Sequence, residues 1–169
     1  MKLIKKLLFI GVLFLGLSAT QAQTKMAHIN TDDLVRAMPE TKQMEDELKK
    51  VGQAYDTEYK SQVNELQAKL QKYDSEAPTQ TDAENQRRAQ EVQELRNKIE
   101  LYAQTAQQEI QKKQFDLLKP IEEKATKAIN DVAAEKGILY VFDSAPGKGL
   151  LVYKGEDLLP AVKAKLGIK

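Results

Sequence analysis

The chain has 169 residues, with 26 basic and 25 acidic side chains, one histidine and no cysteine. Without cysteine it can form no disulfide, thiolate nucleophile or cysteine-ligated metal centre, and a single histidine excludes multi-histidine metal sites. Aromatic residues make up 6% and charged residues 30%, a balance that suits long polar helices better than a broad globular core. The composition predicts a protein that is not an enzyme, with no catalytic residues, no cofactor and no metal ion.

Residues 1–22 have the pattern of a secretory signal peptide. Three lysines precede the apolar run LLFIGVLFLGL, and small residues around Ala22 suit cleavage. The run has about 11 apolar residues, whereas crossing a bilayer takes roughly 20, so we expect cleavage near Ala22 and no stable membrane insertion. Removing the three lysines leaves 23 basic against 25 acidic residues, which argues against nucleic acid as a partner.

The next segment, residues 23–39, is expected to begin a small β-rich body. Residues 25–30, KMAHIN, suit a short strand, and residues 31–38 suit a helical turn. His28 lies in this strand and is expected to be structural, although a lone titratable group near an assembly interface could make it sensitive to pH. Asp32 and Asp33 resemble catalytic carboxylates only superficially, because capping explains them better.

Residues 40–118 carry the periodicity of two long helices. Large apolar residues from Met44 to Tyr73 recur about every 3.6 residues, the α-helical period. Residues 74–82, DSEAPTQTD, interrupt the pattern, and Thr81 with Glu84 forms a capping box that opens a second helix. The sequence therefore predicts a helical-hairpin arm with its tip near 74–82. Two legs of roughly 36 residues, at about 1.5 Å per residue, would project some 50 to 55 Å.

Two prolines mark the expected joint between arm and body. Because the hairpin turns near Thr79, facing residues should have numbers that add up to about 159, which places Pro39 opposite Pro120. Pro39 suits the first turn of a helix, whereas Pro120 should kink the one that contains it.

Seven acid-to-base pairs spaced i, i+4 should support the exposed helices by about 0.2 to 0.5 kcal/mol each. They are Glu45–Lys49, Asp46–Lys50, Glu65–Lys69, Glu84–Arg88, Glu94–Lys98, Glu109–Lys113 and Glu123–Lys127.

Residues 119–169 are expected to complete the body. The return helix should stop at Gly137, residues 138–143 and 150–153 should pair as a β-hairpin, and residues 156–166 should form a last helix. The fold class is thus α+β, mostly α. Three short strands leave open edges and apolar faces that one protomer can hardly cover, so we expect self-association. The predicted oligomer interface comprises Ile29, Leu34, Ile138, Tyr140, Val141, Phe142, Leu150 and Val152.

Four tyrosines on the arm, Tyr55, Tyr59, Tyr73 and Tyr102, are candidates for contact with a client protein. Helical spacing favours the contact line between the two legs for Tyr55 and Tyr59, and an amphipathic ring could serve both roles.

The order of segments resembles the Skp/OmpH family of periplasmic chaperones. The resemblance covers the chain after the signal peptide and is strongest in KMAHINTDDLVRAMPE, in KPIEEKATKAINDVAAEKGILYVFD and in the terminal DLLPAVKAKLGIK. It implies a periplasmic homotrimer with a central β-barrel, whose three arms enclose unfolded outer-membrane proteins. The expected function is that of an ATP-independent holdase, which prevents aggregation of these clients. The alternative is a passive coiled-coil spacer or scaffold of the cell envelope.

Overall fold

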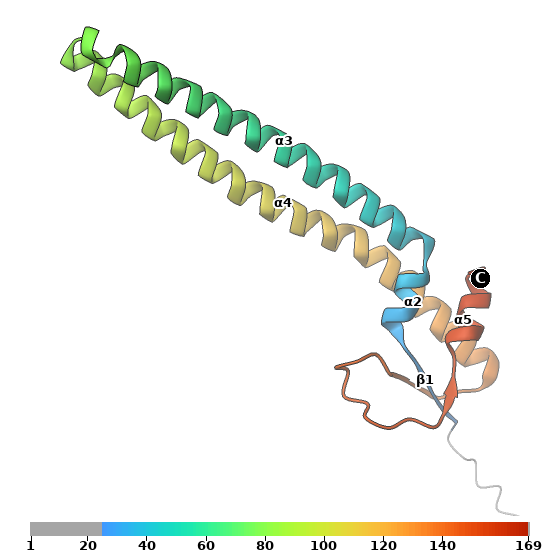
Figure 1. Ribbon diagram of the computed structural model, residues 1–169. Helices are drawn as coiled ribbons and strands as arrows, with labels where there is room; N and C mark the ends of the chain where they lie inside the picture. The colour runs from blue at the N-terminus through green and yellow to red at the C-terminus, as the bar shows by residue number, and fades with distance from the viewer. Residues whose placement is uncertain (1–24, 169) are drawn as a thin grey trace, which may run out of the picture.

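A long helical hairpin projects from a small α/β body in the computed structural model, which describes residues 25–168 (Figure 1). The expected signal peptide lies outside these residues. The two legs are α3 (Pro39–Glu76) and α4 (Asp82–Lys136), joined by the short 3-10 helix η1 (Ala77–Thr79). The body holds β1 (Met26–Ile29), α2 (Thr31–Ala37), β2 (Tyr140–Asp143), β3 (Glu156–Asp157) and α5 (Leu159–Lys165), together with the end of α4. The mostly helical α+β class is confirmed.

The ends of the two long helices follow from local chemistry. Pro39 occupies the first turn of α3, where its missing N–H costs nothing. The Thr81 hydroxyl accepts a hydrogen bond from the Glu84 backbone N–H at 3.2 Å, which confirms the expected N-cap of α4. Gly137 ends α4 with a φ of 64°, a conformation that glycine adopts without steric cost. Pro120 lies inside α4, which continues through it to Lys136.

The contact line between the legs is narrow. Ile99 and Ala106 are the buried apolar residues of its α4 side within the arm. Ion pairs cross from leg to leg between Glu47 and Lys113 and between Lys69 and Glu91, each at 2.6 Å. Both pairs fit the register expected from a turn near Thr79, so the hairpin pairing was predictable from the position of the turn.

Most of the ion pairs expected within the helices are absent from the described residues. Of the seven, the described residues retain Glu65–Lys69 at 3.8 Å and Glu84–Arg88 at 2.9 Å. Lys113 reaches Glu47 on the other leg, and Lys127 pairs with Asp131 at 2.8 Å. A flexible lysine can form ion pairs of similar energy with several nearby carboxylates, so spacing along one helix does not determine its partner.

Gly52 is a weak point in α3. It lies inside a 38-residue helix, and a Cβ added there would meet no atom within 4 Å. Glycine costs a helix interior roughly 0.5 to 1 kcal/mol relative to alanine. Gly52→Ala should therefore raise the free energy of unfolding by about that amount, measured by urea denaturation. A destabilised variant would show that the glycine is needed for a contact or bend.

The sheet of the body has the order β2-β1-β3, and both pairings are parallel. The expected β-hairpin between residues 138–143 and 150–153 is therefore wrong. Residues 150–153 form no strand, and β2 pairs with β1, with Ser144 N–H donating to Ile29 O at 2.8 Å. The N-terminal strand takes the central position, with β2 on one edge and β3 on the other. Local turn residues could not reveal these long-range parallel pairings.

The final helix is shorter than expected. Residues 156–157 form β3 and pair with β1, so α5 begins at Leu159. The Asp157 carboxylate accepts the Leu159 backbone N–H at 2.9 Å, and Pro160 occupies the first turn. This cap and this proline set the helix start after the strand.

The hydrophobic core lies on one side of the sheet. Ala27 and Ile29 of β1 are buried, whereas Met26 is 56% exposed and His28 is half-buried. The buried side packs against α2, α4 and α5 through residues that include Leu34, Val132, Leu158 and Val162. The core thus comes from both ends of the chain, as expected. The opposite side of the sheet has no helix over it within the described residues.

Candidate functional site

The uncovered side of the sheet is rich in large apolar and aromatic side chains. Paired residues of neighbouring strands share a face, so Met26 lies beside Tyr140, and His28 lies beside Phe142. The Tyr153 ring contacts the His28 ring with 4.5 Å between their centroids. We name Met26, Tyr140, Phe142 and Tyr153 the sheet-face patch; each is at least 45% exposed. Such a concentration of exposed aromatic residues is typical of a protein interface.

The expected interface residues divide into two groups. Tyr140, Phe142 and Val152 are exposed, and Val141 and Leu150 are partly buried. Ile29, Leu34 and Ile138 are instead buried in the protomer's own core, at 1%, 0% and 7% exposure. These three residues are corrected from interface to core, because alternation along β1 and packing by α2 turn them inward. Met26 and Tyr153 were missed, although the alternation of β1 could have indicated Met26.

Next to the patch lie backbone N–H and C=O groups that no strand of the described residues pairs with. Residues 150–153 lie in the loop between β2 and β3, where Leu151 is 93% and Val152 75% exposed. β2 is an edge strand of the sheet. An apolar loop and an open edge beside an aromatic face are features that a second chain could cover.

The arm carries a second group of exposed apolar residues. The Tyr55 and Tyr102 rings meet across the legs with 5.9 Å between their centroids, and Tyr59 beside them is 40% exposed. With Gly52, Ala106 and Ile110 they line a shallow groove of about 370 Å³. Burial, followed by the nearby Glu58 and Tyr55, raises the pKa of Tyr102.

Two further exposed arm residues were not predicted from the sequence. Leu101 is 63% exposed and Phe115 is 66% exposed, both on α4. They lie outside the helical stripe used to define the contact line, and a search for large apolar residues off that stripe could have found them.

Tyr73, the fourth tyrosine candidate, belongs to an ion-pair cluster at the tip of the arm. Its hydroxyl donates to Glu91 at 2.9 Å, and the Arg88 guanidinium lies 4.6 Å from its ring centroid. Arg88, only 12% exposed, also pairs with Glu76 at 2.8 Å and Glu84 at 2.9 Å. The cluster joins both legs at their ends. Tyr73 is thus engaged within the arm, unlike Tyr59.

Acid should loosen the tip. Hydrogen bonds from Arg87 and then Arg88 lower the pKa of Glu84 to about 2. A carboxyl with a lowered pKa stabilises the fold fully above its ordinary pKa of 4.5 and loses that contribution as the pH falls toward 2. Amide-exchange protection of residues 82–91 should therefore fall between pH 5 and pH 2.5, with residues 99–106 of the same helix as internal reference. In Glu84→Gln this loss should be smaller; an identical loss in both proteins would contradict the role of Glu84.

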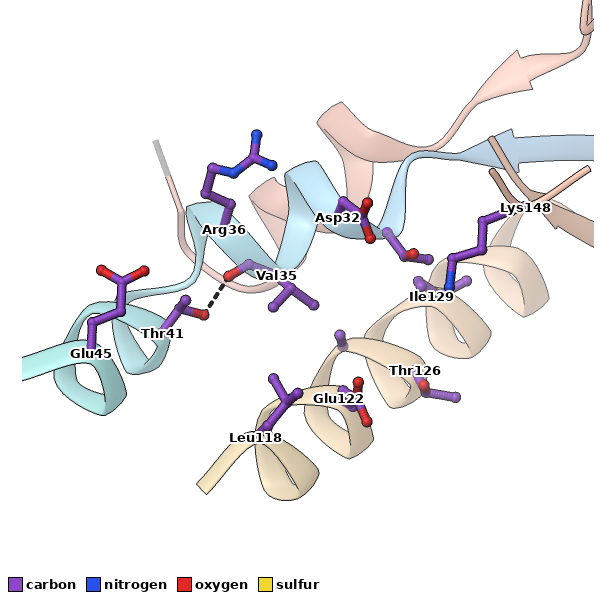
Figure 2. Close-up of a pocket in the computed structure, with 12 residues that line it drawn as sticks. Asp32, Val35, Arg36, Thr41, Glu45, Leu118, Glu122, Thr126, Ile129 and Lys148 are labelled. Atoms are coloured by element: carbon purple, nitrogen blue, oxygen red, sulfur yellow. Dashed lines mark hydrogen bonds between the residues drawn. The ribbon is translucent and has the colours of Figure 1, made fainter. Parts of the chain in front are cut away.

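A cleft of about 520 Å³ lies where the arm meets the body, between α2, the start of α3 and α4 (Figure 2). Val35 of α2 faces Leu118 and Ile129 of α4 across it, and Lys148 reaches in from the β2–β3 loop. The buried Thr41 hydroxyl donates to the Val35 carbonyl and ties α3 to α2. Nearby, Lys124 pairs with Glu40 at the base of the arm. These contacts fix the first turn of the arm to the body.

Pro120 lies opposite the first turn of α3, as the expected register requires. It lines a small hollow at the arm base together with Glu40, Met44 and Ile121. The role of Pro39 and Pro120 as the joint between arm and body stays a prediction.

Asp143 has a structural role at the end of β2. Its carboxylate accepts hydrogen bonds from the Thr31 hydroxyl at 2.6 Å, the Thr31 N–H at 3.2 Å and the Ala145 N–H at 3.0 Å. Burial opposes ionisation, but the bonds from Thr31 and Ala145 outweigh it and lower the pKa of Asp143. Across residues 25–168, no group of three His, Asp or Glu side chains could hold a metal ion. In the same part of the chain, no helix is long and apolar enough to cross a bilayer.

The fold and its surfaces define a protein with a projecting helical hairpin and an uncovered aromatic sheet face. A family model described as outer membrane protein (OmpH-like) matches residues 25–166. The chain therefore belongs to the OmpH-like family. This family is periplasmic and is associated with chaperoning of outer-membrane proteins. No curated protein matches the chain.

Proposed function

We propose that the chain is an ATP-independent periplasmic holdase that binds unfolded outer-membrane proteins between the arms of a homo-oligomer. It would be exported by a signal peptide cleaved near Ala22 and would act without enzymatic chemistry, cofactor or metal. The observation that carries the proposal is the pairing of a long arm bearing exposed apolar residues with a body whose sheet face lacks a cover.

The arm supports the holding role. Tyr59, Leu101 and Phe115 are exposed on it, and Tyr59 adjoins the groove that Tyr55 and Tyr102 line. An unfolded chain presents apolar side chains in no fixed order, so dispersed weak contacts can retain it without selecting one sequence. Several such contacts on one client also act together, which raises the overall affinity.

The body supports self-association. A shared interface would bury the aromatic residues of the sheet-face patch. Removing their apolar area from water stabilises the assembly by roughly 25 cal/mol per Å². Open β edges beside the patch could pair with the residues 150–153 of another protomer. Family resemblance favours three protomers around a central β-barrel, which would set the arms side by side around a cavity.

The test is suppression of aggregation. An unfolded outer-membrane protein is diluted from urea into buffer without nucleotide, and light scattering is followed against increasing chaperone. The holdase proposal predicts suppression that saturates at a fixed ratio of oligomer to client. A passive spacer would leave the scattering unchanged, and an enzyme would act at catalytic ratios; either result overturns the proposal.

A further inference from the structure

The only histidine of the chain lies in the middle of the sheet-face patch. His28 belongs to β1, the central strand, with Phe142 beside it on β2 and Asp157 beside it on β3. The Tyr153 ring lies against the imidazole at a tilt of 53°. Any chain that covers the patch would therefore also cover His28.

Charges near His28 are mostly engaged elsewhere. On β3, Asp157 accepts the Leu159 N–H at 2.9 Å, and Glu156 pairs with Lys136 at 2.8 Å. At the end of β2, Asp143 is bound by Thr31 and Ala145. The remaining titratable groups on β2 and in the adjoining loop are Tyr140, Tyr153, the exposed Lys154 and Lys148, whose ammonium group lies 3.9 Å from Asp143. Phenols ordinarily stay neutral between pH 5 and 8, whereas imidazole is the side chain whose charge ordinarily changes in this range.

One nitrogen of the His28 imidazole lacks a partner: its Nδ1 atom is buried and makes no hydrogen bond to the described residues. A neutral ring can carry its hydrogen on Nε2 and leave Nδ1 as an unpaired acceptor. Protonation adds an N–H at Nδ1, and a buried donor without an acceptor is costly, more so when the group is charged.

We propose that protonation of His28 weakens self-association, so that the assembly dissociates as the pH falls from 7.5 toward 5.5. This inference rests on the proposed function, in which the sheet-face patch is the contact between protomers. Nδ1 is buried in the protomer as well, so its missing partner does not distinguish the two states. The rest of the half-buried imidazole does, because in a free protomer it is open to water and lies across from Asp157. In the assembly the same charge would be enclosed among Met26, Phe142 and Tyr153, where desolvation disfavours it.

The test is sedimentation equilibrium of the untagged mature chain between pH 7.5 and pH 5.5, with His28→Gln as the matched neutral variant. By linkage, each histidine that must lose a proton on association can change the association constant up to tenfold per pH unit. We expect the association constant to fall at least tenfold for the unaltered chain and to change less than threefold for His28→Gln. Equal pH dependence in both proteins, or none in the unaltered chain, overturns the inference.

A second measurement covers the case in which His28→Gln does not fold or associate. The unaltered oligomer is diluted in a calorimeter at pH 6.5 in two buffers of different ionisation enthalpy, which gives the number of protons bound on dissociation. Uptake of about half a proton or more per chain supports the inference; no uptake overturns it. Aggregation suppression at pH 7.5 is measured on the same preparation. If the protein suppresses aggregation but its association does not depend on pH, this inference alone is overturned. If it does not suppress aggregation, the proposed function is overturned.

Discussion

Replacing Phe142 with glutamate should separate the protomers while leaving the helices intact. Phe142 is 45% exposed on the uncovered side of the sheet, so a carboxylate there meets water in the protomer and an apolar surface in the assembly. An unpaired buried charge costs about 3 kcal/mol or more, which corresponds to an association constant reduced by more than a hundredfold. Light scattering should report a lower mass, with circular dichroism unchanged.

The matched control is Phe115→Glu. The same substitution is made at a phenylalanine that is 66% exposed, but on α4 of the arm, and the assembly should keep its mass. Val141→Glu provides the opposite control: Val141 packs against the core, so a charge there should unfold the body. If Phe142→Glu associates as tightly as the unaltered chain, the sheet-face patch is not the contact between protomers.

Shortening the arm should preserve the assembly and weaken the holding of large clients. Deleting residues 66–76 and 83–93 removes 11 residues from each leg and keeps the turn at 77–82. Eleven residues make about three helical turns, so the facing sides of the legs stay aligned while each arm loses about 16 Å. The body contacts and the base of the arm are untouched. A smaller cavity should retain small clients and release large ones.

The readout compares a small and a large outer-membrane protein in the aggregation assay. We expect the shortened chaperone to protect the small client at an unchanged ratio. For the large client, at least several times more chaperone should be needed. If both clients are protected as well as by the full arm, the binding surface is on the body and the arms serve another purpose.

The helical part of the fold was largely predictable. The apolar period between Met44 and Ile110, the N-cap Thr81 and the stop at Gly137 are local signals, and each appears in the structure. Local energetics determine helix starts and stops, so a single sequence carries them. The turn position also fixed the register of the legs, which the Glu47–Lys113 pair obeys.

The sheet was less predictable. Residues 138–143 and 150–153 are both β-prone and are separated by turn formers, which favoured a hairpin. The structure instead pairs β2 and β3 with β1, more than 100 residues away in sequence. Strand pairing at this distance depends on which face packs against α2, α4 and α5, and no short-range pattern encodes that choice.

The candidate surfaces, like the fold, were predictable in part. Tyr140 and Phe142 were predicted at the interface and are exposed. Val141 was predicted there too but packs against the core, because neighbouring residues of β2 point to opposite sides of the sheet. Ile29 and Leu34 were misplaced, because whether an apolar residue packs within the protomer or between protomers depends on the helices that cover it. Leu101 and Phe115 were missed because they depart from the helical stripe.

Amide hydrogen exchange of the assembly with and without bound client tests the central claim most directly. If unfolded outer-membrane proteins are held between the arms, exchange in α3 and α4 should slow on binding, most clearly around Tyr59, Leu101 and Phe115. Exchange in β1 and β2 should stay as it is in the empty assembly, because that face is already covered by other protomers. Protection confined to the sheet, with the arms unchanged, would contradict the account.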